Sequence, residues 1–391
     1  MDVVIIGAGQ AAAQLAISLR QDGFAGSICM IGDEPYLPYQ RPPLSKKFLR
    51  EGGSPESLFL RPASFWHDHE VALVIGTAAG EVDIKQRRVL LRDGREFDYR
   101  TLVFATGTRA RALQLPGIDL GSVFSLRKTD DVRQLRPALD EARRISIIGG
   151  GYIGLEVAAA MRAEGRHVTV LEAQDRVMAR VTGEEVSAFF ERTHRQHGVD
   201  IRLRTQLVAI EKQTNGLRVR DSAARDVSAD VVLIATGARA NDELAALAGL
   251  ACEEGILVNE LAATSAPDVY AIGDCARFPS RRYACRLRLE CVQHAIDHAK
   301  AAAAAIRGEG VPYDPVPWFW SDQYELKFQI AGVMAGHDAA VVIGDPTSAQ
   351  FSVDYRRNGR LIAVDAVNNA RAYMMGRRRI AEETDLGPRD S

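Results

Sequence analysis

A pattern of strand, glycine turn and helix occurs twice in the chain, and this duplication constrains the fold more than any other feature. The apolar run at 3–6 leads into the turn at 7–12, GAGQAA, and then into a helix-like stretch. The apolar run at 145–148 leads into the turn at 149–154, GGGYIG, and another helix-like stretch. Short apolar strands that alternate with helices predict parallel sheets of the α/β class. The chain therefore contains two similar strand–helix–strand units.

The glycines in these turns are spaced as a bound dinucleotide requires. The first glycine permits a tight turn, the second lets the backbone approach a pyrophosphate, and the third lets the helix pack on the strand. Ala12 takes the third position in the first copy. The pyrophosphate would meet the helix N-terminus, where free N–H groups favour negative charge. One such turn alone also occurs between ordinary strands and helices, but two copies favour two nucleotide-binding units.

Each unit has an acidic residue after its second strand, Asp33 in the first copy and Glu172 in the second. A carboxylate at this position accepts hydrogen bonds from ribose hydroxyls and repels a 2′-phosphate. Glu172 therefore predicts a preference for NADH over NADPH. Arg176 and Arg180 follow closely and could accommodate a phosphate, which leaves the strictness of this preference open. A solvated strand end is the alternative for Glu172.

Length and composition exclude several classes of protein. A chain of 391 residues suggests two or three domains, because one core rarely extends beyond about 300 residues. Lys and Arg number 49 against 51 Asp and Glu, so the net charge of −2 does not indicate nucleic-acid binding. The five cysteines form no C-x-x-C pair, which argues against a zinc site or a disulfide framework. With no signal-peptide pattern and no uncharged apolar run of about 18 residues, the sequence predicts a soluble, cytoplasmic protein.

The third region of the chain has a different pattern. Prolines at 312, 315 and 317 end the Ala-rich helical stretch at about 295–307. Apolar and polar residues then alternate at 351–355 and 361–365, on either side of Asn358-Gly359. Such alternation around an Asn-Gly pair predicts antiparallel strands joined by a tight turn. The C-terminal region is therefore expected to be α+β.

Further motifs show a resemblance to a known family. They are PYQRPPLSK at 38–46, GGGYIGLE at 149–156, AIGDC at 271–275, RLECVQHA at 288–295 and PWFWSDQY at 317–324. Together they resemble the FAD-dependent, NADH-linked ferredoxin reductases of bacterial oxygenase and cytochrome P450 systems, the putidaredoxin reductase and rubredoxin reductase type. The resemblance extends over almost the whole chain. Cys291 stands where serine is common in that family, and His294 where asparagine is common.

The resemblance implies two doubly wound, Rossmann-like nucleotide-binding domains followed by an α+β domain. The implied boundaries are 1–108 and 240–315 for a discontinuous FAD domain, 109–239 for an NAD domain, and 316–391 for the C-terminal domain. The resemblance places FAD against Gly7, Gly9, Gln10, Asp33, Arg41, Lys46, Ala79, Arg127, Asp274 and Val292. It places NADH against Gly149, Gly151, Ile153, Glu156, Glu172 and Gly237.

Three residues are candidates for a part in catalysis: Lys46, Glu156 and Trp320. A reduced flavin carries negative charge, so a lysine near its ring stabilises it and can hydrogen-bond toward N5. Lys46 is the candidate for that role, with a solvated lysine as the alternative. Glu156 falls in the first helical turn after the glycines, near the expected nicotinamide, although an acid there also complements the helix dipole. Trp320, like Trp318, covers the flavin or fills the core.

The cysteine positions distinguish between flavoenzyme classes. A disulfide reductase needs a redox cysteine pair at the flavin, and a thiol peroxidase needs one reactive cysteine. No cysteine occurs between Cys29 and Cys252, and the later ones form no C-x-x-C pair. Electrons are therefore expected to leave the flavin directly for a protein acceptor.

Two clusters of arginines are suited to steering an acidic partner. Five arginines fall within 277–288 and four within 371–379. Such clusters raise the association rate of an acidic protein without requiring a large interface. Scattered, solvated arginines are the alternative. The expected partner is a [2Fe–2S] ferredoxin that docks near Arg281, Arg282, Lys300 and Arg378, with no nucleic acid and no membrane involved.

The sequence therefore predicts a ferredoxin–NAD⁺ reductase. It would pass electrons from NADH through FAD to a [2Fe–2S] ferredoxin that serves an oxygenase or a cytochrome P450. One alternative is a thiol-type NADH oxidase or peroxidase, which the missing cysteine disfavours. Another is a flavin-binding interaction protein of the apoptosis-inducing-factor type, which shares the RPPLSK string and normally carries a targeting leader.

Overall fold

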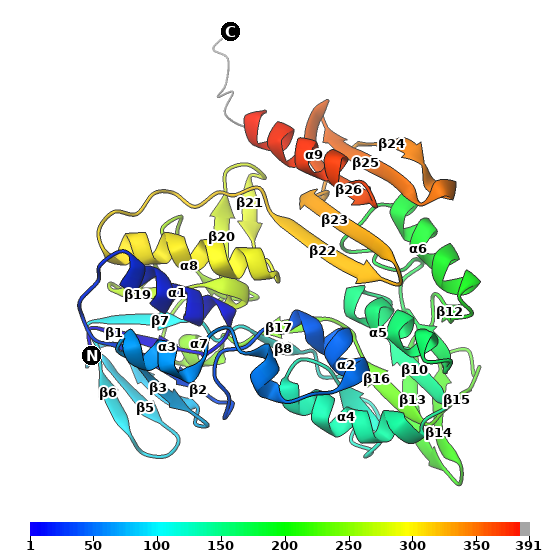
Figure 1. The fold of residues 1–391 in the computed structure, drawn as a ribbon, viewed down its shortest axis with the longest axis horizontal. Helices are drawn as coiled ribbons and strands as arrows, with labels where there is room; N and C mark the ends of the chain where they lie inside the picture. Colours follow the sequence, from blue (N-terminus) through cyan, green and yellow to red (C-terminus); the bar gives the residue numbers. More distant parts are fainter. Residues whose placement is uncertain (384–391) are drawn as a thin grey trace. The chain divides into compact units, whose positions relative to one another are not determined.

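The protein is described here by a computed structural model, which covers residues 1–383 (Figure 1). The chain folds into two compact units. The first unit, called unit 1, comprises Met1–Gln40, Ser54–Arg109 and Arg239–Pro317. The second, called unit 2, comprises Arg41–Gly53, Ala110–Ala238 and the described residues 318–383. The α/β fold class expected from the sequence is confirmed, whereas the three-domain boundaries stay a prediction.

Unit 1 is built on a parallel five-stranded sheet of order β19-β7-β1-β2-β3. Its strands are β1 (Val3–Ile6), β2 (Ile28–Gly32), β3 (Val71–Ile75), β7 (Thr101–Phe104) and β19 (Val269–Ala271). Helices α1 (Gln10–Gln21) and α8 (Val292–Ile306) lie side by side on one face (Figure 1). Val3 and Ile5 pack on that face, while Val4 and Ile6 enter a second core on the other. Because both faces are covered, β1 is a continuous apolar run.

Smaller elements complete unit 1. They are η2 (Pro55–Leu58), α3 (Ala63–Asp68), β4 (Ala79–Asp83), β5 (Arg88–Leu91), β6 (Glu96–Asp98), α7 (Glu243–Leu247), β18 (Ile256–Leu257), η3 (Gly273–Cys275), β20 (Ala276–Ser280) and β21 (Cys285–Leu287). Strands β8 (Thr108–Ala110) and β17 (Ala238–Ala240) contain two of the five points where the chain passes from one unit to the other.

Unit 2 repeats the arrangement, with a parallel sheet of order β12-β11-β10-β16-β9. Its strands are β9 (Val123–Ser125), β10 (Arg144–Ile148), β11 (His167–Leu171), β12 (Asp200–Arg202) and β16 (Val231–Ile234). In each unit the glycine turn follows the middle strand of the sheet, β1 or β10. The strand after the helix, β2 or β11, lies on one side, and β7 or β16 lies on the other. The predicted duplication is confirmed.

Further elements of unit 2 flank this sheet. They are η1 (Pro42–Ser45), α2 (Lys47–Glu51), α4 (Thr129–Glu141), α5 (Tyr152–Ala163), α6 (Glu184–Gln196), and an antiparallel sheet of β13 (Leu207–Gln213), β14 (Gly216–Asp221) and β15 (Val227–Ala229). Helix α5 follows β10 directly, as the sequence predicts.

The C-terminal part of unit 2 is an antiparallel sheet of order β22-β23-β26-β25-β24 with helix α9 against it (Figure 1). Its elements are β22 (Trp318–Gln323), β23 (Leu326–Gly332), β24 (Ala339–Asp345), η4 (Pro346–Ser348), β25 (Gln350–Arg357), β26 (Arg360–Val367) and α9 (Ala370–Glu382). Asn358 (φ 52°) and Gly359 (φ 77°) join β25 to β26. Positive φ at both central residues is the geometry that tight hairpins favour, so the predicted turn is confirmed.

Within residues 1–383, no helix has the length and apolar character needed to cross a lipid bilayer.

A buried polar network joins the C-terminal sheet to the segment before α6. The Asp365 carboxylate accepts hydrogen bonds from the hydroxyls of Thr182 and Tyr355, the latter at 2.8 Å. The Tyr355 hydroxyl in turn accepts from the backbone N–H of Gly183 at 2.9 Å. Burial raises the pKa of Asp365 to about 7. The network therefore holds a carboxyl group that titrates near neutrality.

Asp365→Asn is expected to change how stability depends on pH. Because the folded-state pKa lies above the ordinary value, the stabilisation from protonated Asp365 is complete below about pH 4 and is lost as the pH rises through about 7. The wild-type Tm should therefore fall relative to that of the variant between pH 5 and pH 8. Roughly 1 kcal/mol shifts the Tm of a 150–250-residue domain by about 2–4 °C. Calorimetry that finds the same Tm difference at both pH values would contradict the prediction.

Candidate active site

The first glycine of each turn has a conformation and a close neighbour that exclude a side chain. Gly7 has φ 120° and Gly149 has φ 108°. A Cβ at Gly7 would lie 2.1 Å from the carbonyl oxygen of Ala105, and one at Gly149 would lie 2.4 Å from that of Ala235. These carbonyls directly follow β7 and β16, so the missing side chain lets each turn lie against the neighbouring strand's end.

The second glycine of each turn borders open space. Apart from the glycine itself and its neighbours in the chain, no atom of the described residues lies within 4 Å of the position that a Cβ would take at Gly9 or Gly151. Each of these glycines is the N-cap of the following helix, and neither end has a side-chain cap. The first-turn N–H groups are thus available for an anion, and the backbone leaves room for a pyrophosphate. Both turns therefore have the open space and the free N–H groups that the predicted dinucleotide cofactors require.

The third position of each turn shows the packing role expected for it. A Cβ at Gly154 would lie 2.1 Å from the carbonyl oxygen of Gly149, so only glycine allows this approach of α5 to the turn. In the first copy, Ala12 is fully buried, and the first unit therefore has space for one methyl group there.

Both acidic residues occupy the same place, directly after the second strand of their unit. Glu172 follows β11 and Asp33 follows β2, where it is exposed. The Glu172 carboxylate accepts hydrogen bonds from the backbone N–H groups of Gly150 at 2.6 Å and Gln174 at 2.8 Å. Glu172 therefore lies at the glycine turn and holds its backbone.

The two arginines after Glu172 differ in their surroundings. The Arg176 guanidinium donates to the carbonyl oxygens of Thr182 at 2.7 Å and Ala179 at 2.9 Å. The Arg180 guanidinium lies against Gly237, where a Cβ would come within 2.7 Å of its Nη2. Gly237 has φ 98°, and it is one of the three glycines that the family resemblance predicts for NADH binding.

Lys46 and Glu156, which are 110 positions apart, form a direct ion pair in unit 2. The distance from Lys46 Nζ to Glu156 Oε2 is 2.8 Å. The Lys46 side chain is 25% exposed and that of Glu156 only 5%. Lys46 lies between η1 and α2, whereas Glu156 lies in α5, just beyond the second glycine turn. The structure thus brings two of the three predicted catalytic residues into contact.

Two serines complete the surroundings of this carboxylate. Ser45 Oγ donates to Glu156 Oε2 at 2.6 Å, and Ser321 Oγ donates to Glu156 Oε1 at 2.7 Å. Gln323 Nε2 donates to Ser321 Oγ at 3.2 Å. Three donors satisfy a buried carboxylate that would otherwise be costly to desolvate. Sequence reasoning missed both serines, although they lie inside the motif strings at 38–46 and 317–324.

The other predicted residues divide between the two units. Unit 1 contains Gly7, Gly9, Gln10, Asp33, Ala79, Asp274 and Val292. Unit 2 contains Arg41, Lys46, Arg127, Gly149, Gly151, Ile153, Glu156, Glu172, Gly237 and Trp320. Arg41 and Arg127 are brought together, because Arg41 Nη1 donates to the Arg127 carbonyl oxygen at 2.9 Å. Asp274 accepts from the Thr108 hydroxyl at 3.3 Å.

Trp320 belongs to a series of aromatic rings on and around β22. Its ring lies 5.7 Å from that of Trp318 and 6.3 Å from that of Phe319. The Phe319 ring packs on Tyr152, the fourth residue of the glycine turn at 149–154, with the ring centroids 4.5 Å apart. Trp320 itself is half-buried, and its part in catalysis stays a prediction.

The first arginine cluster lies on the hairpin β20–β21 and is largely neutralised by acids from other segments. Arg277 pairs with Glu253 at 3.0 Å, and Arg281 pairs with Glu260 at 3.3 Å. Arg288 pairs with Glu290, just outside the cluster, at 2.7 Å. Counting the arginines within 277–288 therefore overestimates the net positive charge of this surface.

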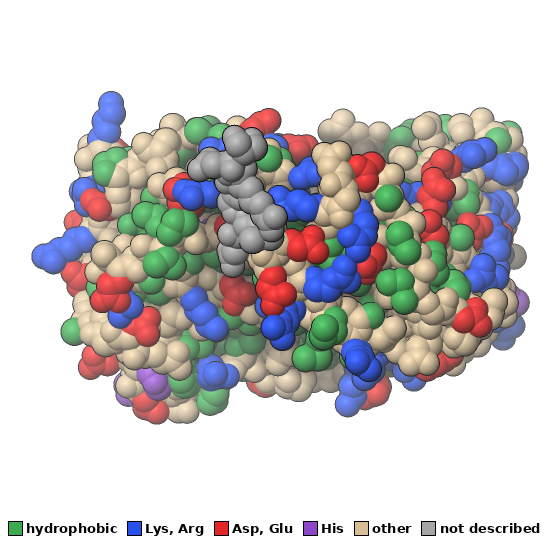
Figure 2. Space-filling model, turned by 90° about the horizontal axis from the view of Figure 1, so that it is seen from above, with side chains coloured by type: hydrophobic (Ala, Val, Ile, Leu, Met, Phe, Trp, Pro, Cys, Tyr) green, Lys and Arg blue, Asp and Glu red, His purple; other side chains and the backbone are tan. Residues whose placement is uncertain are grey.

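The second cluster lies on α9. Arg378 pairs with Glu382 at 2.6 Å, Arg379 pairs with Asp354 at 3.2 Å, and Arg377 lies over the Trp318 ring. Basic and acidic side chains are interspersed on the face of the molecule shown in Figure 2. The side chains of Arg281 and Arg378 are each 74% exposed, and such exposed pairs contribute little stability, so a partner's carboxylate can replace them.

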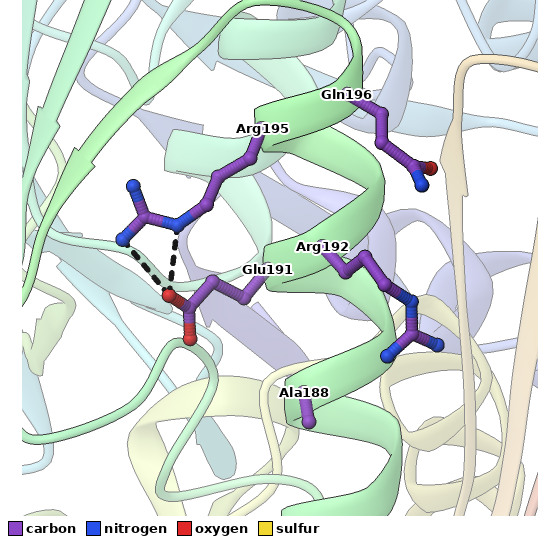
Figure 3. A pocket seen from close by; sticks show the side chains of 5 residues that line it. All are labelled: Ala188, Glu191, Arg192, Arg195 and Gln196. Carbon is purple, nitrogen blue, oxygen red and sulfur yellow. Dashed lines mark hydrogen bonds and ion pairs between the residues drawn. The ribbon is translucent and has the colours of Figure 1, made fainter.

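A shallow surface hollow lies along α6, apart from all of the predicted residues. It is lined by Ala188, Glu191, Arg192, Arg195 and Gln196 (Figure 3). Arg195 and Glu191 pair with each other at 2.9 Å, and Arg192 and Gln196 project on the other side of the helix. All lining residues belong to one helix, so no polar groups converge from different elements to form a binding site.

The chain belongs to the pyridine nucleotide-disulphide oxidoreductase family, whose model matches residues 1–304. A model described as Reductase C-terminal matches residues 318–390. The chain is 45% identical to a ferredoxin–NAD(P)⁺ reductase from Sphingomonas sp., with 99% of this chain and 94% of that protein covered. It is 38% identical to putidaredoxin reductase from Pseudomonas putida, with 99% and 93% covered.

Solved structures show the same relationship. The ferredoxin reductase for the CYP199A2 system from Rhodopseudomonas palustris has a TM-score of 0.94 and 40% identity, covering 96% of this chain and 93% of that one. The covalent putidaredoxin reductase–putidaredoxin complex gives 0.93 and 39%, covering 97% and 93%. A water-forming NADH oxidase from Lactobacillus brevis gives 0.91 at 18% identity, which shows a shared fold alone. The resemblance predicted from the motifs is confirmed.

Glu172→Ala is expected to raise the KM for NADH about tenfold, because it removes the predicted ribose acceptor and releases the Gly150 backbone. The FAD content, measured from the visible absorbance, should stay at the wild-type level. Asp175→Ala, an exposed acid in the same loop, is the matched control and should leave KM unchanged. An equal loss of FAD in Glu172→Ala would contradict the assignment of this turn to NADH.

Proposed function

We propose that this protein is an NADH-dependent ferredoxin reductase. It passes electrons from NADH through FAD to a [2Fe–2S] ferredoxin, which serves an oxygenase or a cytochrome P450. One observation carries the proposal: two glycine turns, each with open space at the second glycine and an uncapped helix N-terminus, lie in a chain that is similar over its full length to named ferredoxin reductases.

Each turn has its own cofactor in this proposal. FAD binds along the turn of unit 1, with Gly7, Gly9 and Gln10 at its pyrophosphate and Asp33 at its adenosine ribose. Ala79, Asp274 and Val292 add contacts, and so do Arg41, Lys46 and Arg127. NADH binds along the turn of unit 2, at Gly149, Gly151, Ile153, Glu156, Glu172 and Gly237. The FAD domain (1–108 and 240–315), NAD domain (109–239) and C-terminal domain (316–391) belong to the same proposal.

The Lys46–Glu156 pair supplies the electrostatics of the site. FAD, when bound, supplies the capacity to accept two electrons together and release them singly. Lys46 Nζ contributes a positive charge and a hydrogen-bond donor, and the buried Glu156 carboxylate holds that ammonium at a defined position. Ser45 and Ser321 orient the carboxylate. The Lys46 ammonium is therefore already in position before negative charge develops on a neighbouring group.

Three of the five cysteines, Cys29, Cys275 and Cys291, are unsuited to a thiol relay. Burial raises the pKa of the Cys29 thiol to about 11 and that of Cys291 to about 12. Burial also raises the pKa of Cys275. A thiol with a raised pKa stays protonated near neutral pH and is a poor nucleophile. This supports a route that leads directly from FAD to a protein acceptor rather than a thiol oxidase or peroxidase reaction.

We place the protein in the cytoplasm. All five cysteines are free thiols, as a reducing compartment favours. Fractionation of cells that express the native chain would test this placement.

Anaerobic mixing with NADH tests the proposed function. The purified protein should be yellow, should bleach when NADH is added, and should then reduce a [2Fe–2S] ferredoxin. A screen across plant-type, adrenodoxin-type and Rieske-type ferredoxins should identify at least one acceptor. A colourless protein, or a flavin that NADH does not bleach, would contradict the proposal. Bleaching without transfer to any ferredoxin would instead favour the flavin-binding interaction protein.

Glu156→Gln is expected to slow flavin reduction by NADH roughly 10- to 100-fold, because Lys46 loses its buried counter-charge. The FAD content should be unchanged. Ser321→Ala removes one orienting hydrogen bond and keeps the charge pair, so its rate should fall only severalfold. Stopped-flow absorbance measures both rates. A wild-type rate in Glu156→Gln would exclude the pair from this step.

Arg281→Gln and Arg378→Gln, tested separately, are each expected to slow ferredoxin reduction severalfold at low ionic strength. Both side chains are largely exposed, so their charge is available to steer an acidic partner. The difference from wild type should shrink as salt is added. Ferricyanide reduction provides the control. An equal fall in the ferricyanide rate would show that these arginines do not act through docking.

A further inference from the structure

Four rings pack together in unit 1, beside the turn that contains Asp274. They belong to Phe278 in β20, His294 and His298 in α8, and Tyr313. His298 stacks on Tyr313 with ring centroids 4.7 Å apart, and His294 stacks on Phe278 at 5.1 Å. His294 is 3% exposed and His298 is fully buried. Two imidazoles are thus enclosed in a core position where apolar side chains would ordinarily suffice.

The hydrogen bonds of the two histidines differ. His298 Nδ1 accepts a hydrogen bond from the backbone N–H of Gly273 at 3.3 Å. His294 Nδ1 instead pairs with the Tyr313 hydroxyl at 2.9 Å. An Nδ1 that accepts requires the proton of a neutral imidazole to be on Nε2. Burial lowers the pKa of His298 well below its usual range, which keeps the ring neutral.

The Nε2–H of His298 has no hydrogen-bond partner among the described residues. A buried donor without a partner destabilises a fold, and a phenylalanine at this position would stack on Tyr313 without that cost. The packing of the rings therefore does not explain a histidine here. The acceptor that Nδ1 offers to Gly273 does explain it.

The Gly273 turn is held on two sides. Gly273 begins η3 with φ 69°, and Asp274 follows it. A Cβ at Gly273 would lie 2.9 Å from the Cβ of Ala11 in α1 and 3.9 Å from that of Ala295 in α8. The first turns of both helices thus enclose η3. The His298 hydrogen bond fixes the backbone N–H that directly precedes Asp274.

We infer that His298 is a positioning residue of the flavin site: its Nδ1 fixes the Gly273 backbone and thereby the turn that presents Asp274 to FAD. The inference rests on the proposed function, in which Asp274 binds the ribityl–phosphate side of FAD. His298 is fully buried, so it acts through the backbone of Gly273. A change at His298 should therefore alter how tightly FAD is held.

Two matched variants separate this role from ring packing. His298→Phe keeps a ring on Tyr313 and removes the acceptor, whereas His298→Asn removes the ring and keeps an amide oxygen near the Nδ1 position. The rate of FAD release is measured by flavin fluorescence after dilution of the holoprotein. We expect release at least tenfold faster in His298→Phe, equal to about 1.4 kcal/mol, and within threefold of wild type in His298→Asn. Wild-type release in His298→Phe, or equal rates in the two variants, would overturn the inference.

Tyr313→Phe is the control within the same cluster. It removes the hydrogen bond to His294 and keeps the one between the Gly273 N–H and His298 Nδ1, so FAD release should stay within threefold of wild type. Acceleration as large as in His298→Phe would attribute the effect to general loosening of the cluster and would overturn the inference. Wild-type protein that binds no FAD would instead contradict the proposed function itself.

Amide hydrogen exchange gives a second measurement, which does not require a variant to fold. In wild-type holoprotein the Gly273 N–H should exchange at least a hundredfold more slowly than an unprotected amide, because it is buried and bonded to His298. An unprotected Gly273 amide would overturn the inference.

Discussion

A missing β-carbon at the first residue of each glycine turn is the constraint on which both nucleotide units depend. At Gly7 and Gly149, the carbonyl oxygen that follows the neighbouring strand occupies the space where a side chain would begin. Any other residue would push that strand end away from the turn. Because the first glycine lies so close to the sheet, the second one, Gly9 or Gly151, can face open space at a helix N-terminus. The same backbone geometry thus packs the sheet and prepares a site for phosphate.

The Lys46–Glu156 pair shows how a buried charge is accommodated at the proposed site. Two serines and one lysine donate to the same carboxylate, and they come from the segment before α2 and from β22. A carboxylate enclosed to this degree would be strongly destabilising without these donors. Its partner ammonium is less buried, at 25% exposed, and is therefore accessible to a ligand that binds beside it. The same side chains therefore stabilise the buried carboxylate and position the Lys46 ammonium at the proposed site.

The two departures from the family pattern fit the structure of α8. Cys291 is the N-cap of this helix, and its sulfur accepts a hydrogen bond from the backbone N–H of His294 at 3.4 Å, as a serine hydroxyl would. The His294 side chain turns to Tyr313. Folding also lowers the net positive charge expected for the first arginine cluster. Arg277 and Arg281 pair with Glu253 and Glu260, which lie outside the stretch 277–288.

The sequence by itself determined the glycine turns, the buried strands, the acids that follow them and the Asn358-Gly359 hairpin. Each of these features depends on backbone sterics or on side-chain periodicity within a few residues, so each can be predicted from a short stretch of sequence. Only the tertiary structure decided that Lys46 meets Glu156, that Ser45 and Ser321 complete that carboxylate, and that His298 bonds to Gly273. The physical reason is that a contact between distant residues depends on how whole helices and strands pack. That packing results from many weak interactions, which cannot be read from a short stretch of sequence.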